Sequence, residues 1–150
     1  MIIRLAKNSD GAAVVRSVSR LMEELGFEDF DGEGLGEVFT DLVGGEGHGF
    51  AMVAEENGKI TAICTVSKVI ALRTSGLYGI VQEMYVSPEV RGQRIGAELL
   101  LAALRQAQLL GCSMVEVGTP PEGTRQGRFY CRAGFKRFGD RFRYTFDAAG

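Results

Sequence analysis

A short stretch of glycine and arginine, RGQRIGA at 91–97, comes directly before a long apolar run that is typical of a helix. The first N–H groups of a helix have no partner inside it, and the helix dipole adds about half a positive charge there. Gly92 and Gly96 allow a ligand to approach the backbone closely, while Arg91 and Arg94 add side-chain charge. These residues predict a site for a phosphate or diphosphate group at this turn.

Two common phosphate-binding motifs do not fit this stretch. A P-loop requires GxxxxGK followed by Ser or Thr, and no Lys-Ser or Lys-Thr pair follows the glycines here. A dinucleotide fingerprint requires GxGxxG after the first strand of its βαβ unit, whereas this turn lies past the middle of the chain. The diphosphate site must therefore be of another kind.

The other candidate for chemistry is an acid. Glu83 lies in the apolar run LYGIVQEMYV at 77–86, which predicts a central strand, and there it could take a proton as a general base. An ion pair or an outward-facing carboxylate is the structural alternative. His48, in the glycine-rich stretch GGEGHGF, and a water chain are the other candidates for the base. His48 is the single histidine of the chain, which argues against a histidine-based metal site, and no metal is predicted.

Hydrophobic spacing and turn residues predict the elements that must position these groups. Asn57-Gly58 between two apolar runs favours a tight hairpin turn. The expected strands are 2–5, the two arms of the hairpin at 49–72, 77–86, 112–118, and one or two strands within 136–146; the expected helices are 9–25, 32–45, 95–110 and 122–133. This order predicts one mixed α/β domain over residues 1–150, centred on a strand, crossover helix and parallel strand between 77 and 117.

Composition excludes several classes of protein. The formal net charge is only −2, which disfavours a general nucleic-acid binder. No apolar run reaches the roughly 18 residues of a membrane span, and the first residues lack the pattern of a signal peptide. The three cysteines are odd in number and lack CxxC spacing, so we expect reduced thiols and a cytoplasmic protein.

Two stretches together resemble a known family. EMYVSPEVRGQRIGAELL at 83–100 is similar to the acyl-CoA-binding motif of the GNAT acetyltransferase superfamily, written [RQ]-x-x-G-x-[GA]. RFYCRAGF at 128–135 resembles the FYxxxGF segment of the same family. There are two departures: the family usually has glycine where this chain has Arg94, and often has asparagine where it has Gly123.

The resemblance implies a GNAT-type acyl-CoA N-acyltransferase fold, in which helices flank a central, mixed, mostly antiparallel sheet. It also implies direct transfer of an acetyl group from acetyl-CoA, as cosubstrate, to a primary amine. Tyr130 would be the general acid, or would only hydrogen-bond the departing thiolate; packing against Phe129 and Phe135 is its structural alternative. Glu83 is the second candidate catalytic residue. The implied coenzyme-binding residues are Met84, Tyr85, Val86, Arg91, Gly92, Gln93, Arg94, Ile95, Gly96 and Ala97.

The acceptor is expected to be cationic. Residues 23–56 contain many acids and no Lys or Arg. The acidic segment 23–46 covers the helices that usually wall the acceptor site in this family. The expected partner is a small-molecule or peptide amine, with neither nucleic acid nor membrane, and a homodimer is left open. A non-catalytic acyl-CoA-binding sensor or partner module is the alternative function, and a role on charged tRNA would favour a more basic chain.

Overall fold

A computed structural model of the chain describes residues 1–45, 47–118, 123–139 and 141–147. The chain comprises two units, Met1–Gly118 and Thr119–Gly150. The first unit contains β1 (Ile2–Leu5), α1 (Gly11–Glu24), α2 (Leu35–Gly44), β2 (Gly49–Glu56), β3 (Lys59–Ala71), β4 (Gly76–Val86), α3 (Ile95–Leu109) and β5 (Val115–Val117). The second unit contains α4 (Arg125–Arg132).

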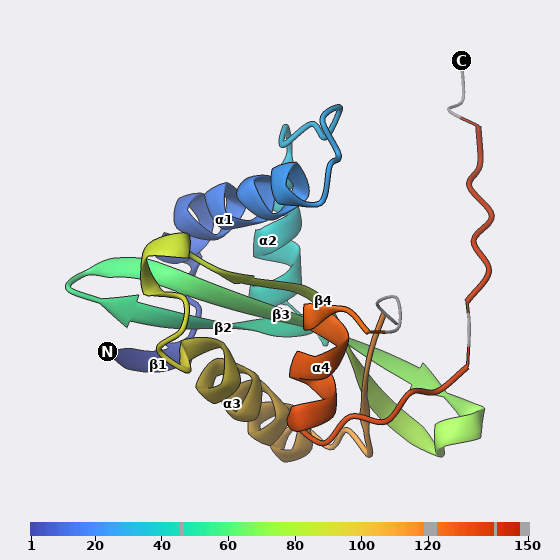
Figure 1. The fold of residues 1–150 in the computed structure, drawn as a ribbon. Helices are drawn as coiled ribbons and strands as arrows, with labels where there is room; N and C mark the ends of the chain where they lie inside the picture. The colour runs from blue at the N-terminus through green and yellow to red at the C-terminus, as the bar shows by residue number, and fades with distance from the viewer. Residues whose placement is uncertain (46, 119–122, 140, 148–150) are drawn as a thin grey trace. The chain divides into compact units, whose positions relative to one another are not determined.

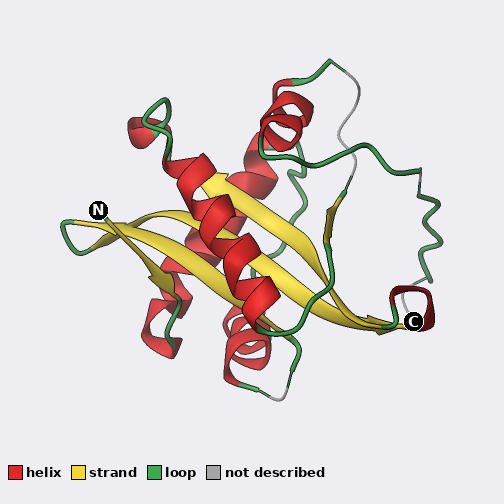
Figure 2. Cartoon of the chain, turned by 90° about the horizontal axis from the view of Figure 1, so that it is seen from below, coloured by secondary structure: helices red, strands yellow, loops and turns green. Residues whose placement is uncertain are grey.

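The strands form a five-stranded sheet in the order β1-β2-β3-β4-β5 (Figures 1 and 2). The first four strands are antiparallel, and β5 pairs parallel to β4 after the α3 crossover. Asn57 and Gly58 make the turn between β2 and β3 with φ values of 51° and 76°, the left-handed pair that a tight hairpin requires. The mixed, mostly antiparallel sheet predicted from the sequence is confirmed.

Helices cover both faces of this sheet. In Figure 1, α1 and α2 lie above the strands and α3 below them, and Figure 2 shows α3 crossing the strands on its face. On the α1–α2 side, Val14 and Phe39 join a core cluster with Val53, Ile63 and Tyr85. On the other side, Leu99 and Leu100 of α3 are fully buried. Burial of a leucine side chain contributes about 1.5–3 kcal/mol to the free energy of folding, so these two residues stabilise the packing of α3 on the sheet.

An ion-pair network fixes the first strand to the start of α1. The Arg4 guanidinium donates to both carboxylate oxygens of Asp10, at 2.8 and 3.0 Å, and to the Glu55 carboxylate, at 2.7 and 2.9 Å. The Lys7 N–H also donates to Asp10, at 2.7 Å. Hydrogen bonding to Arg4 holds the pKa of the Asp10 carboxyl below its ordinary value, against the opposing effect of burial.

The end of the chain differs from the sequence prediction. Residues 136–139 and 141–147 have no regular secondary structure, although the alternation of aromatic and basic residues there favours a strand. A strand also needs backbone partners on a neighbouring strand, and a residue pattern cannot supply those. Phe142, Tyr144 and Phe146, the residues that would form one face of such a strand, are exposed.

Candidate functional site

The turn between β4 and α3 presents a row of free backbone N–H groups. The Arg91 N–H reaches the Pro88 carbonyl at 3.3 Å, and the next described N–H with a carbonyl partner is that of Glu98, which reaches Arg94 at 3.1 Å. Among the described residues, the N–H groups from Gly92 to Ala97 have no acceptor. Gly92 has a φ of +82°, and the space around the position of a Cβ there is open. Such a row at a helix N-terminus fits the diphosphate of an acyl coenzyme A.

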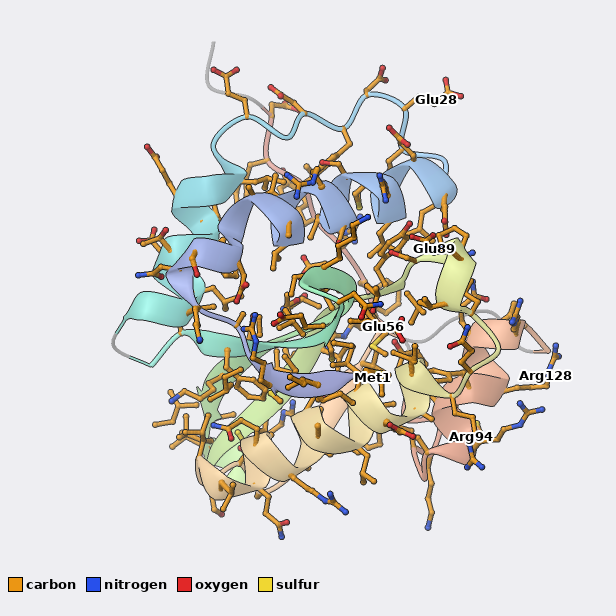
Figure 3. All side chains as sticks on the ribbon, turned by 90° about the vertical axis from the view of Figure 1, so that its left-hand side faces the viewer. Met1, Glu28, Glu56, Glu89, Arg94 and Arg128 are labelled. Atoms are coloured by element: carbon orange, nitrogen blue, oxygen red, sulfur yellow. The ribbon has the colours of Figure 1, made fainter. Side chains whose placement is uncertain are left out.

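Arg94 has an unusual backbone conformation for its residue type. It is the N-cap residue of α3 with φ 65° and ψ 8°, in the left-handed region, and its side chain does not cap the helix. This conformation costs a non-glycine residue about 1 kcal/mol, which explains why glycine is common at such a position. Figure 3 shows the Arg94 side chain at the beginning of α3. The exposed Arg94 side chain therefore adds positive charge at the start of α3.

Arg91, in contrast, is held by neighbouring groups. Its Nε donates to the Val86 carbonyl at 2.8 Å, and its Nη2 donates to both carboxylate oxygens of Glu24, at 2.7 and 2.9 Å. The guanidinium also lies over the Tyr85 ring, 5.7 Å from the ring centre. Arg91 thus connects the turn to the last residue of β4 and to the end of α1.

The final part of β4 extends past its parallel neighbour. The pairing of β4 with β5 runs from Gly79 to Val81, whereas β4 continues to Val86. Tyr85 is buried in the core, so the groups that it could offer to a ligand are those of its backbone. Residues 82–86 therefore have one edge without a paired strand among the described residues, and that edge leads directly into the turn.

Glu83 is fixed on β4 by a threonine of β3. A bulge places Thr65 opposite Glu83 and Val66 opposite Val81, which leaves Gln82 without an opposite residue. The buried Thr65 hydroxyl donates to the Glu83 carboxylate and accepts the Glu83 N–H at 3.0 Å. Burial, and secondarily the negative charge of Glu83, raise the pKa of the neighbouring Cys64 thiol to about 12. Glu83 is thus an oriented, half-buried carboxylate on the strand that precedes the turn.

His48, the other candidate base, is an exposed residue just before β2. Its carbonyl accepts the N–H of Lys68 at 2.8 Å, and no side-chain hydrogen bond to it is found in the described part of the chain. Within that part there is also no group of three or more His, Cys, Asp or Glu residues that could hold a metal ion. His48 is thus exposed and without a described side-chain hydrogen bond, whereas the Glu83 carboxylate is oriented by Thr65.

Tyr130 lies on α4, in the second unit. The helix starts at Thr124, whose hydroxyl accepts the Gly127 N–H at 3.2 Å. The Tyr130 ring contacts Phe129 and Phe135 edge-to-face, with ring centres 5.1 and 5.5 Å apart. The packing expected for this tyrosine is therefore present, and its catalytic role stays a prediction.

A hollow of about 420 Å³ lies at the end of α1. It is lined by Met22, Gly26, Phe27, Glu28, Asp29 and Phe30. Figure 3 shows Glu28 on the segment after α1, on the outer side of this helix, and Glu89, from the turn between β4 and α3, between Glu28 and Arg94 in this view. The hollow combines two carboxylates with two aromatic rings, a composition that suits a cationic ligand.

Comparison with known proteins agrees with this architecture. The model of the GNAT acetyltransferase domain matches residues 47–137, which include β2 to β5, the turn before α3 and all of α4. The chain belongs to the GNAT acetyltransferase family. No helix among the described residues of this GNAT protein is both long and apolar enough to cross a membrane.

Relatives of this GNAT chain differ in the acceptors that their names give. Over 93 residues it is 32% identical to an aminoalkylphosphonate N-acetyltransferase of Salmonella typhimurium, a match that spans 62% of this chain and 59% of the relative. A predicted acetyltransferase of Clostridium acetobutylicum, solved with acetyl-CoA, has a TM-score of 0.81 at 20% identity, with 96% of this chain and 95% of that one covered. Glucosamine-6-phosphate N-acetyltransferase of Arabidopsis thaliana has a TM-score of 0.76 at 21% identity, with 97% and 98% covered. Both structures share the fold with this chain.

Two residues of the site were missed in the sequence. Thr65 lies within the apolar run TAICTV, and only the register of β3 against β4 places it beside Glu83. Glu24 is 67 positions from Arg91, and no spacing rule connects residues so far apart. The motif identified the turn, and the structure adds the side chains that hold it.

Proposed function

We propose that this chain is an N-acetyltransferase that transfers an acetyl group from acetyl-CoA directly to a primary amine. One observation carries the proposal: the row of free N–H groups at 92–97 continues the unpaired edge of β4. Membership of the GNAT family supports the same reaction. The bound coenzyme supplies an activated acetyl thioester. The residues of the chain bind and orient the two substrates and transfer protons.

Binding of acetyl-CoA is assigned to the turn and the edge that precedes it. The backbone from Arg91 to Ala97 holds the diphosphate, with Arg94 adding charge beside it. The backbone of residues 84–86 pairs with the pantetheine arm. An N–H group of Met84 or Tyr85 holds the thioester carbonyl oxygen, where a hydrogen bond to growing negative charge is worth about 3–4 kcal/mol.

Proton transfer is assigned to Glu83 and Tyr130. The Glu83 carboxylate takes the proton that the attacking amine loses, directly or through water. The Thr65 hydroxyl keeps this carboxylate in one orientation, as its hydrogen bond to it supports. The Tyr130 hydroxyl hydrogen-bonds the departing thiolate or protonates it. Full protonation is slightly uphill, by about 2 kcal/mol, because a thiol has an ordinary pKa near 8.5 and a tyrosine near 10.

A cationic amine is the acceptor that we favour. The carboxylates of Glu28 and Asp29 and the rings of Phe27 and Phe30 line the hollow at the end of α1. Polyamines, aminoglycosides and lysine-containing peptides have the required charge. Opposite charges would raise the local concentration of such an amine near the hollow.

An aminoalkylphosphonate is the second candidate acceptor. The Salmonella relative acts on such a compound according to its name. A phosphonate is anionic, so it would need arginine contacts, for which Arg73, Arg125 and Arg128 are the candidates. The two acceptor classes differ in the sign of their charge and can be separated by one assay.

The test is release of free thiol from acetyl-CoA in the presence of an amine panel. The panel contains spermidine, an aminoglycoside, a lysine-rich peptide, an aminoalkylphosphonate and glucosamine 6-phosphate. Turnover of the cationic members supports the favoured acceptor, and turnover of the phosphonate alone supports the second candidate. Acetyl-CoA binding without turnover of any amine would support a non-catalytic acyl-CoA-binding module instead.

Two broader predictions accompany this function. Residues 1–150 form one GNAT domain, and the protein is cytoplasmic. All three cysteines, Cys64, Cys112 and Cys131, are free thiols, which supports a reducing environment.

A further inference from the structure

We propose that Glu24 is a positioning residue for the coenzyme-binding turn, and that it acts through Arg91. The inference rests on the proposed binding of acetyl-CoA and adds to it a residue from outside the motif. Glu24 is the last residue of α1, whereas Arg91 begins the turn before α3. Both belong to the first unit, Met1–Gly118.

The Arg91 guanidinium is held by three partners: the Glu24 carboxylate, the Val86 carbonyl and the Tyr85 ring. Nη2 of Arg91 reaches both oxygens of the Glu24 carboxylate, at 2.7 and 2.9 Å, while Nε is bound to the Val86 carbonyl at 2.8 Å. The guanidinium plane also rests near the Tyr85 ring, 5.7 Å from its centre. A long side chain loses rotamer freedom when it is held in this way, so the arrangement depends on each of its partners.

The arrangement leaves part of the guanidinium available. Nη1 of Arg91 makes no hydrogen bond to any residue that the structure describes. The adjacent N–H groups, from Gly92 onward, are likewise without acceptors in the described part of the chain. Glu24 therefore holds Arg91 in a conformation in which Nη1 has no described acceptor, on the residue directly before the row of free N–H groups at 92–97. A preorganised donor binds an anion more tightly because less ordering remains to be done on binding.

The positioning role predicts the direction in which acetyl-CoA affinity changes when the Glu24 carboxylate is removed. Glu24 is an acid near the site of an anionic coenzyme, so simple repulsion predicts that its removal should tighten acetyl-CoA binding. Positioning predicts the reverse, because Arg91 loses the partner that orients it. The two explanations thus differ in the direction of the change and not only in its size.

Glu23 provides a matched control. It is the neighbouring acid on the same exposed turn of α1, and its side chain makes no hydrogen bond or ion pair among the described residues. Glu23→Gln and Glu24→Gln remove the same charge at nearly the same place. Any difference in coenzyme affinity between them therefore comes from the contact with Arg91.

The experiment is titration calorimetry of acetyl-CoA against the full chain, for the wild type, Glu23→Gln, Glu24→Gln, Arg91→Ala and the Glu24→Gln/Arg91→Ala double variant. We expect Glu24→Gln to weaken binding about threefold, as suits an exposed pair in which one nitrogen, Nη2, reaches both carboxylate oxygens. Glu23→Gln should leave affinity unchanged or slightly higher. In the Arg91→Ala background, Glu24→Gln should cause no further loss, because its effect passes through Arg91.

A kinetic measurement separates positioning from general destabilisation. Glu24→Gln should raise KM for acetyl-CoA by the same factor, with kcat at saturating coenzyme and the melting temperature unchanged. Equal affinities of Glu23→Gln and Glu24→Gln, tighter binding by Glu24→Gln, or a loss that persists without Arg91 would each overturn the inference. A wild-type protein that does not bind acetyl-CoA would instead overturn the proposed function.

Discussion

At the scale of single residues, the aromatic ring and the hydroxyl of Tyr130 make separable contributions. The ring packs against Phe129 and Phe135, so Tyr130→Phe keeps the packing and removes the hydroxyl alone. If the hydroxyl assists the departing thiolate, kcat should fall by about 100-fold or more with little change in acetyl-CoA affinity. Steady-state kinetics at saturating coenzyme, together with calorimetry, measure both quantities. Tyr144→Phe is the control, because Tyr144 is an exposed tyrosine of the same unit; equal turnover in the two variants would assign Tyr130 a purely structural role.

The sequence predicted candidate chemical groups for the site but not the side chains that contact and orient them in the structure. The spacing of Arg91, Gly92 and Gly96 indicated the turn, because binding of a phosphate group by backbone N–H groups depends on residues that are close in sequence. Thr65 and Glu24 were not predicted, because each contacts a residue that is distant in sequence. The register of β3 against β4 places Thr65 beside Glu83, and the packing of α1 places Glu24 beside Arg91. Local patterns report what neighbouring residues do, and they carry little information on such distant pairs.

At the scale of elements, Asp10 shows how the start of α1 is fixed to β1. Its carboxylate has a lowered pKa in the folded chain because Arg4 donates to it, so the folded state favours the charged form. The corresponding stability is present above the ordinary aspartate pKa, near 3.9, and is lost as pH falls through the lower folded value. Asp10→Asn should therefore lower stability by about 2 kcal/mol near neutral pH and by progressively less as pH falls below the ordinary aspartate pKa.

Chemical denaturation of the wild type and Asp10→Asn between pH 7 and pH 2.5 tests this expectation. Asp41→Asn serves as the comparison, because Asp41 is an exposed acid on α2. A difference between the wild type and Asp10→Asn that stays constant over the whole pH range would show that the Asp10 charge does not contribute.

Elements were predictable where their signals were local. The Asn57-Gly58 hairpin and the long helix after the turn agree with the structure, since turn conformation and apolar periodicity depend on nearby residues. The strand prediction for 136–146 was wrong in the described residues, because alternation alone cannot provide a backbone partner. The β4 bulge at Gln82 was not predicted either, since a single additional residue leaves the hydrophobic pattern of the strand almost unchanged.

At the scale of the whole molecule, a small net charge conceals an uneven distribution. The chain carries −2 in total, yet its acids concentrate at 23–56 and many of its arginines lie after residue 90. The acids at 28 and 29 line the hollow at the end of α1, whereas Asp31 accepts the N–H of Glu33 at 2.9 Å and so has a local structural function. The hollow, rather than the acidic segment as a whole, is therefore the place to test for acceptor binding.

The double variant Glu28→Gln/Asp29→Asn should raise KM for a cationic acceptor severalfold and leave KM for acetyl-CoA unchanged, because it removes the charge that attracts the amine. The difference from wild type should shrink as salt rises, since exposed charges are screened over about 8–10 Å at physiological ionic strength. Glu37→Gln/Asp41→Asn removes the same charge from α2, outside the lining of the hollow. If both double variants raise KM equally, the effect comes from the general field of the protein. If neither does so, and the phosphonate is the better substrate, the acceptor is anionic and its contacts must be sought among the arginines.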